Sequence, residues 1–360
     1  MDAGGRSPVQ DVPQWTGAEA RVLRLALRMS MRAYAEHLGV SLRTVAKWES
    51  PRADVRLRPD SQAMLDTALA RAEPTARARF DQVVPPRHGT VTVSDHETWT
   101  EDLERAITYT SQQEFTFAST LVNRWLGVHE PATLDARGRY LYGRSLVLMG
   151  DIRRDQGAIV GPLSARRSYL SAREVFSGLS IPRRLAQIDL SLAVVQEMSG
   201  HLEISARAYE ELAADDRLSR RDRARARLWV GTALSKCDHT EYAVRAITRA
   251  TREFDDLGEV EDWSVAHQKL ALACRSAGDI DQALKCLTIA RNTGTTGSPM
   301  QRVRLDTAHA HILLSDAATR QEGFGVLDRA AATALRHGLR HQLGSIEKIR
   351  REQADTSQGD

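Results

Sequence analysis

Long apolar runs and paired cysteines are both missing from this chain. No uninterrupted apolar stretch approaches the roughly 20 residues that a membrane span requires, and the opening residues, MDAGGRSPVQ, lack the apolar run of a signal peptide. We therefore expect a cytoplasmic protein without membrane contacts. The three cysteines are odd in number and lack metal-ligand spacing, which argues against a disulfide framework and fits a reducing compartment.

Signatures of catalysis are absent as well. The sequence has no Gly-x-x-x-x-Gly-Lys loop, no Gly-x-Ser-x-Gly elbow, no His-Glu-x-x-His and no Gly-rich dinucleotide turn. His309 and His311 would point to different sides of a helix, and Gly338 separates His337 from His341 near a helix end. We expect no catalytic residue, no metal site and no cofactor, so the chain is not predicted to be an enzyme.

Aromatic residues make up only 5% of the 360 residues, whereas Ala, Leu and Arg recur throughout. Strong helix formers in that proportion predict an all-α chain, and its length predicts more than one domain or a domain with a repeat array. Only five of the 50 basic residues are lysines. That bias toward arginine indicates a GC-rich genome.

The net charge of +3 is concentrated in one small region. Residues 18–60 carry nine basic and five acidic side chains, whereas residues 61–360 are neutral in sum. A local excess of positive charge is what phosphate binding by a single module requires.

Apolar periodicity and breaker residues divide the chain into five parts. A tail rich in Gly, Pro and Ser is followed by a compact helical module, a linker, a long helical array and a short C-terminal tail. We expect these parts to span residues 1–17, 18–75, 76–96, 97–352 and 353–360.

The helical module contains a close two-helix corner in the segment RLALRMSMRAYAEHLGVSLRTVAKWESP, residues 24–51. Helices are predicted from Met31 to Leu38 and from Ser41 to Glu49, with Gly39 supplying the positive φ of the turn. A small Ala35 lets the two helices approach, and a buried Val45 completes the corner.

This segment resembles the helix-turn-helix family of phage-repressor (Xre/Cro) type, with Trp48-Glu49 closing the second helix. The resemblance implies that this helix enters the major groove of double-stranded DNA. It further implies pairing of Arg24 with Glu49. Two departures are Met31, where the family has glutamine, and Pro51, where it has glycine.

The residues expected to contact DNA follow from the same alignment of positions. Arg43 and Lys47 lie four apart on one face and suit guanine, while Leu42 suits a thymine methyl group. The full predicted set adds two residues near the sugar-phosphate backbone and two flanking phosphate contacts, giving Arg32, Ser41, Leu42, Arg43, Thr44, Lys47 and Arg52.

The array shows a repeat when SLAVVQEMSGHLEISARAYEELAA, GTALSKCDHTEYAVRAITRATREF and ALACRSAGDIDQALKCLTIARN are compared. In each, a helix ends at Gly or Asp and a second helix begins with a small residue. Five apolar positions in the second helices lie 40, 38, 40 and 40 residues apart, namely Ala172, Leu212, Ala250, Ala290 and Ala330. A fixed period of this length indicates stacked helical hairpins.

These hairpins resemble tetratricopeptide repeats over residues 97–340, about six pairs, with a period longer than the roughly 34 residues typical of that family. The matching pairs of positions are Gly143 with Gly150, Gly231 with Asp238, and Ala271 with Gly278. The resemblance implies a right-handed α-solenoid behind the N-terminal bundle. The arginines at 166–167 and 220–227 are interpreted as a solvated face rather than a docking patch.

Together these features predict a sequence-specific DNA-binding transcriptional regulator of actinobacterial type that acts as a homodimer. The resemblance to such two-part regulators implies control by a peptide, small-molecule or protein ligand in the repeat groove. The alternative is a protein-protein interaction scaffold in which the N-terminal module only docks.

Overall fold

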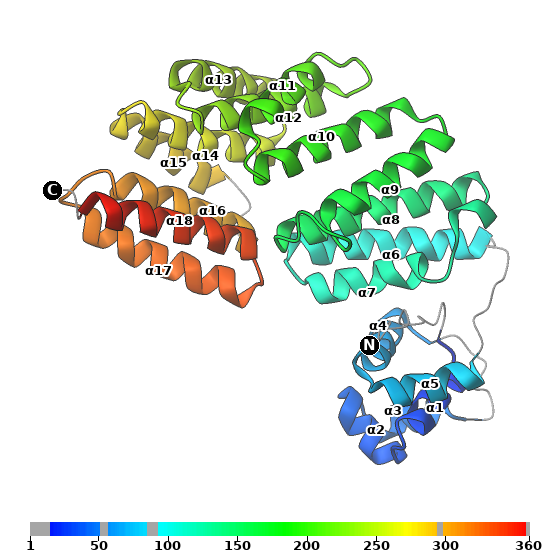
Figure 1. Ribbon diagram of the computed structural model, residues 1–360. Coiled ribbons are helices and arrows are strands. Elements are labelled where there is room, and N and C mark those ends of the chain that lie inside the picture. The colour runs from blue at the N-terminus through cyan, green and yellow to red at the C-terminus, as the bar shows by residue number, and fades with distance from the viewer. Residues whose placement is uncertain (1–14, 51–56, 85–92, 294–297, 358–360) are drawn as a thin grey trace, which may run out of the picture. The chain divides into compact units, whose positions relative to one another are not determined.

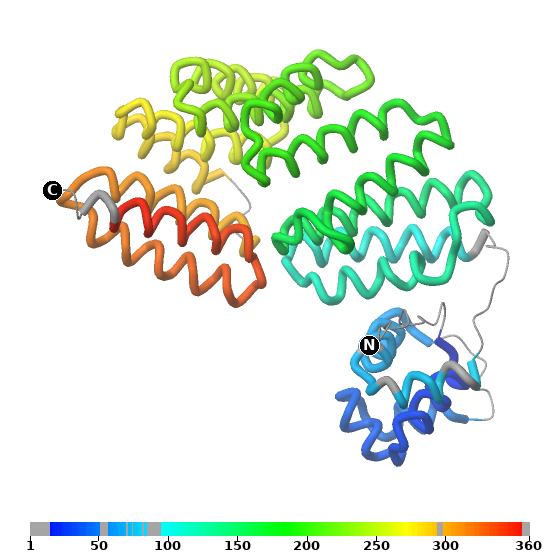
Figure 2. Tube along the Cα trace, in the orientation of Figure 1, coloured from blue at the N-terminus to red at the C-terminus, as the bar shows by residue number. Residues whose placement is uncertain are grey.

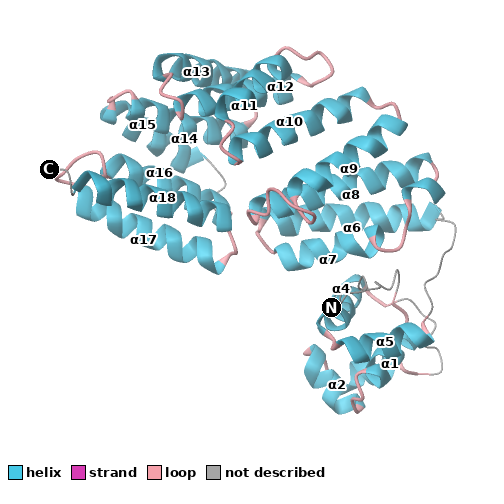
Figure 3. Ribbon diagram, in the orientation of Figure 1, coloured by secondary structure: helices cyan, strands magenta, loops and turns pink. Residues whose placement is uncertain are grey.

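The computed structural model describes residues 15–50, 57–84, 93–293 and 298–357. Every element in these ranges is a helix, which confirms the predicted all-α class (Figures 1 and 3). The chain divides into two compact units, one formed by Met1–Thr110 and Phe115–Ser145 and the other by Ser111–Glu114 and Leu146–Asp360. None of the described helices has both the length and the apolarity needed to cross a bilayer.

The first unit holds the N-terminal bundle and the first helical hairpin. Its elements are α1 (Gly17–Ala26), α2 (Met31–Leu38), α3 (Leu42–Trp48), α4 (Pro59–Arg71), α5 (Pro74–Val83), α6 (Val93–Ser111), α7 (Phe115–Leu126), the 3-10 helix η1 (Pro131–Thr133) and the first half of α8 (Ala136–Asp155).

The second unit continues from α8 as a run of antiparallel hairpins, traced in Figure 2. They are α9 (Ala165–Gly178), α10 (Pro182–Met198), α11 (Leu202–Ala213), α12 (Arg220–Ser235), α13 (Thr240–Asp256), α14 (Val260–Ser276), α15 (Ile280–Thr293), α16 (Pro299–Leu313), α17 (Arg320–Arg336) and α18 (Arg340–Ser357).

The bundle is longer at both ends than the sequence indicated. Trp15, assigned to the tail, is fully buried, and its indole Nε1 donates to Asp66 over 2.6 Å. Part of the expected linker, residues 76–96, is helical, because α5 packs Phe80 against the Trp15 ring at 5.5 Å between centroids. Apolar contacts within the bundle order both segments. These contacts could not be predicted, because the local sequence is rich in helix breakers and charged residues.

The repeat register is confirmed. All five predicted marks lie in second helices and are buried, from α9 through α17. Small residues at the start of second helices are fully buried too, as predicted for Ser205, Ala243 and Ala283. Close approach of the two helices therefore explains why small residues recur at these positions, since each hairpin buries them against its own first helix.

The turns within the hairpins use left-handed backbone. Gly200, Asp238 and Gly278 occupy equivalent turns with φ of 89°, 62° and 80°. Inside the first helices, Gly231 meets the next helix so closely that a Cβ there would lie 2.9 Å from the carbonyl oxygen of Ala243. The predicted motif therefore needs a small residue at this position, because a larger side chain would collide with the next helix.

The first helices of successive pairs, α10, α12, α14, α16 and α18, pack side by side as an inner layer. Within this second unit the array also returns on itself. A Cβ on Gly157, in the turn after α8, would lie 3.1 Å from the backbone nitrogen of His341 at the start of α18. Helix α18 runs to Ser357, so the C-terminal tail expected from residue 353 is helical over its first five residues.

Candidate nucleic-acid interface

The α2–α3 corner is built by local hydrogen bonds that the sequence dictates. Gly39 takes a left-handed conformation with φ 68° and ψ 28°, and the next backbone N–H, of Val40, donates to the carbonyl of Ala35 over 2.9 Å. Ser41 then caps α3, its hydroxyl accepting from the backbone N–H of Thr44 over 3.1 Å. The predicted turn chemistry is confirmed at each step.

Helix α3 has one buried and one exposed face. Val45 and Trp48 turn inward and join the bundle core. Leu42, Arg43 and Lys47 are exposed on the opposite face. Leu42 is 49% exposed beside these two cations, so α3 presents an apolar and two cationic groups together on its outer face.

The two ends of the motif are tied together through Arg24 of α1. Its guanidinium donates to both carboxylate oxygens of Glu49 over 2.6 Å and to the carbonyl of Met29 over 3.0 Å. The hydrogen bond to Glu49 raises the pKa of Arg24. This pair, implied by the resemblance, fixes the C-terminal end of α3 against α1 and thereby the angle at which α3 is presented.

The remaining predicted contacts are placed as follows. Ser41 and Thr44 lie at the exposed start of α3, where their hydroxyl oxygens are 2.8 Å apart. Arg32 is exposed on α2 with Glu36 3.9 Å away. Arg52 falls outside the described residues. The corner thus brings six of the seven predicted residues onto the solvent-facing side of α2 and α3.

A buried arginine joins the bundle to the first hairpin within the first unit. Arg124 of α7 is 1% exposed; it pairs with Asp102 of α6 over 3.1 Å and also hydrogen-bonds the side-chain oxygen of Gln62 in α4. The same oxygen of Gln62 accepts from the backbone N–H of Trp15 over 3.4 Å. Sequence reading missed this contact, because the signal is a lone arginine in the otherwise uncharged helix α7.

The arginine run at 220–227 is more than a solvated face. Arg221 and Arg225 both donate to Asp262 of α14, over 2.6 and 2.8 Å, and Arg227 hydrogen-bonds Glu253 of α13. These guanidiniums join neighbouring repeats, while Arg221 and Arg225 remain 38% exposed to solvent.

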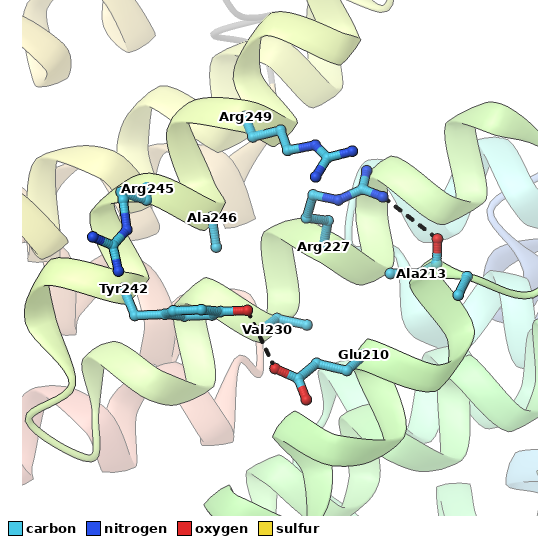
Figure 4. Close-up of a pocket in the computed structure, with 9 residues that line it drawn as sticks. Glu210, Ala213, Arg227, Val230, Tyr242, Arg245, Ala246 and Arg249 are labelled. Carbon is cyan, nitrogen blue, oxygen red and sulfur yellow. Dashed lines mark hydrogen bonds between the residues drawn. The ribbon is translucent and has the colours of Figure 1, made fainter.

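A surface pocket of about 340 Å³ opens between α11, α12 and α13 (Figure 4). Tyr242 lies along one wall with its hydroxyl 3.5 Å from Glu210, and Arg249 faces Arg227 at the other end. Its cations already have partners, since Arg245 pairs with Glu241 and Arg249 with Glu253. No sequence motif indicates this pocket, because its lining residues are spread over positions 210–249.

The chain was compared with known proteins. No family model and no curated protein sequence matches it. Among solved structures, a Rap protein complexed with competence and sporulation factor superposes with a TM-score of 0.51 at 13% identity, covering 95% of this chain and 98% of that one. Bacillus thuringiensis PlcR, in complex with the peptide PapR7 and DNA, gives a TM-score of 0.41 at 12% identity, covering 77% and 93%. The Rap likeness supports the helical-repeat fold of this chain.

Proposed function

We propose that this chain is a cytoplasmic, sequence-specific DNA-binding transcriptional regulator whose repeat array takes a ligand. The observation that carries the proposal is α3, which buries Val45 and Trp48 while exposing Leu42, Arg43 and Lys47 on one face. A guanidinium and an ammonium four residues apart suit the N7 and O6 acceptors of guanine in the major groove.

The protein acts on DNA as a homodimer, because one such module reaches too few base pairs for specific binding. Each protomer places one α3 in one half-site. The ligand role of the array has the support of the Rap structure, which shares the repeat fold and contains competence and sporulation factor. Arg124 offers a route between the two functions, since its buried contacts join α4 of the bundle to the first hairpin.

The test begins with selection of binding sites from random double-stranded DNA by the full-length chain. Affinity for the selected site is then measured over a salt series for Arg43→Ala, Lys47→Ala and the double variant. Each single change is expected to weaken specific binding by about tenfold or more, and loss of a phosphate-contacting cation lowers the salt slope by about one. Lys285→Ala, on the exposed face of α15, is the matched control.

Circular dichroism of the same variants separates lost contacts from lost folding, because helicity is expected to stay unchanged. Unaltered affinity and salt slope in the double variant would refute the assignment of α3 to the groove. If no DNA is selected at all, the scaffold alternative replaces the regulator.

A further inference from the structure

Five successive first helices of the inner layer each contribute one titratable side chain to a shared electrostatic region. The five positions shift along these helices, from the C-terminal end of α10 to the start of α18. They come from α10, the C-cap of α12, α14, α16 and α18, and are Glu197, Lys236, Lys269, Arg304 and His341.

These side chains share one electrostatic environment. Lys269 interacts with Arg304, Lys236 and Glu197, and His341 interacts with all four of the others. Helices α14 and α16 are in register at this level, because the side chain of Gln268 donates to the backbone carbonyl of Arg304 over 3.4 Å. The cluster therefore joins charged groups from five helices of the second unit.

Part of the cluster is internally neutralised. Glu197 accepts from Lys236 over 2.7 Å and from the hydroxyl of Tyr209 over 2.8 Å. From α8, Arg154 approaches the same region and pairs with Asp151 and Asp155 over 2.9 and 3.0 Å. These groups have their partners.

Lys269 and Arg304 are not neutralised by ion pairs of this kind. Both are partly buried, and neither forms an ion pair with a carboxylate of the described residues, although Glu197 attracts Lys269 and Asp155 attracts Arg304 at longer range. The ammonium of Lys269 lies 5.7 Å from the centroid of the Trp229 ring. Burial, with Arg304 and Lys236 nearby, lowers the pKa of Lys269 to about 7, and burial also lowers the pKa of Arg304. The two cations repel each other, and partial desolvation adds to the cost of holding both charges there.

We infer that Lys269 and Arg304 form an oxyanion-binding site in the array, which receives a carboxylate or phosphate group of the ligand. The inference rests on the proposed function in that it names the chemistry of the array's ligand. A guanidinium offers a planar pair of donors and an ammonium a third, and the oxygens of one such anion can accept from both groups. The pocket between α11 and α13 lacks this property, because its three arginines are paired within the chain.

The repeat geometry explains why these two positions are suited to a ligand. Each side chain comes from a different helix, so the site depends on the spacing of α14 against α16 rather than on a local loop. An anion held by both groups would tie these helices together. Ligand binding then stabilises the array as a unit, which is the response that a regulator needs.

The test uses the full-length chain and three defined probes at constant ionic strength. Phenyl phosphate, acetyl-Gly-Gly-Gly with a free carboxylate, and the amide of the same tripeptide are each titrated while the melting temperature is recorded. The two anions are expected to raise the melting temperature and the amide to leave it unchanged, because a ligand of the native state stabilises it. Which anion gives the larger shift at equal concentration identifies the phosphate or the carboxylate as the source.

Two variants and two controls make the test specific. Lys269→Met and Arg304→Gln are each expected to weaken anion binding about tenfold or more. Without any probe, each is expected to melt at or above the wild-type temperature, since an uncompensated charge is removed. Lys285→Met and Arg252→Gln, exposed on α15 and α13, should retain the wild-type response.

The inference is overturned if neither anion raises the melting temperature of the wild type. It is also overturned if Lys269→Met and Arg304→Gln show the same shift with the anions as the wild type. These assays contain no DNA. Loss of selected-site binding therefore bears on the proposed function, whereas loss of the anion response bears only on this site.

Discussion

The guanidinium of Arg24 and the carboxylate of Glu49 meet through two hydrogen bonds of 2.6 Å, with side chains only 12% and 7% exposed. They join the first helix of the bundle to the residue that ends α3. A charge pair so enclosed adds little net stability over an apolar replacement, but loss of either partner leaves a buried charge unpaired.

Glu49→Ala is accordingly expected to destabilise the bundle by about 3–5 kcal/mol. The measurement is urea unfolding followed by tryptophan fluorescence, to which Trp15 and Trp48 in the bundle core contribute two of the six tryptophans. Glu36→Ala is the matched control, because its partner Arg32 is 3.9 Å away and both side chains are exposed. Equal unfolding midpoints for the two variants would contradict the structural role of Glu49.

Gly231→Ala tests the helix contact within the array. The added methyl group would lie 2.5 Å from the Cγ1 of Ile247 and 2.9 Å from a backbone oxygen, so α12 and α13 must separate. We expect a loss of about 2–3 kcal/mol in the free energy of unfolding. Gly325→Ala, in α17, meets only the far end of Arg329 at 3.8 Å and should gain about 0.5–1 kcal/mol. Destabilisation by both changes would point to general glycine effects instead.

Asp238→Gly should stabilise the array. Asp238 is a non-glycine residue with φ of 62° in a turn where the equivalent positions, 200 and 278, are glycines. Relief of the left-handed conformation is worth up to about 1 kcal/mol. The reciprocal change, Gly278→Asp, is expected to cost a similar amount, and differential scanning calorimetry of both variants checks the pair of signs.

Lys269 predicts a rise of stability with pH. Its pKa falls from 10.5 to about 7 on folding, so the unfolded chain binds more protons between these values. Unfolding free energy should therefore increase by about 1 kcal/mol per pH unit from pH 7 upward and be lowest below pH 7. Lys236, Glu197, Arg304 and His341 face the same site. His341, whose pKa burial lowers from 6.5, titrates below this window.

The measurement is urea unfolding of the wild type and of Lys269→Met from pH 6 to 9. The difference between their slopes isolates this lysine from every other titrating group. If the unfolding free energies of the wild type and of Lys269→Met change equally with pH, the ammonium of Lys269 is not desolvated.

Local chemistry made much of this fold predictable. The Gly39 corner, the Ser41 cap and the burial of Val45 each follow from one residue and its immediate neighbours. The repeat marks could be found because each repeat uses the same small residues for the same contact. The burial of Trp15 could not be predicted from neighbouring residues, because its partners, Asp66 and Phe80, lie more than 50 positions away.

The same limit applies to the sites. Arg43 and Lys47 could be placed on one exposed face because their spacing on a single helix determines which face they share. Lys269 and Arg304 are 35 residues apart on different helices, and the repeat register does not align them. Their interaction depends on how α14 packs against α16, which neither local sequence indicates.

The approach of Gly157 to His341 limits how this array can evolve. An open stack can gain or lose a hairpin at little cost, because each unit touches only its neighbours. Here the turn after α8 meets the start of α18, so duplication of one hairpin would shift the last helix away from its partner. We expect related chains to vary their surfaces and turn lengths freely while keeping the number of hairpins constant.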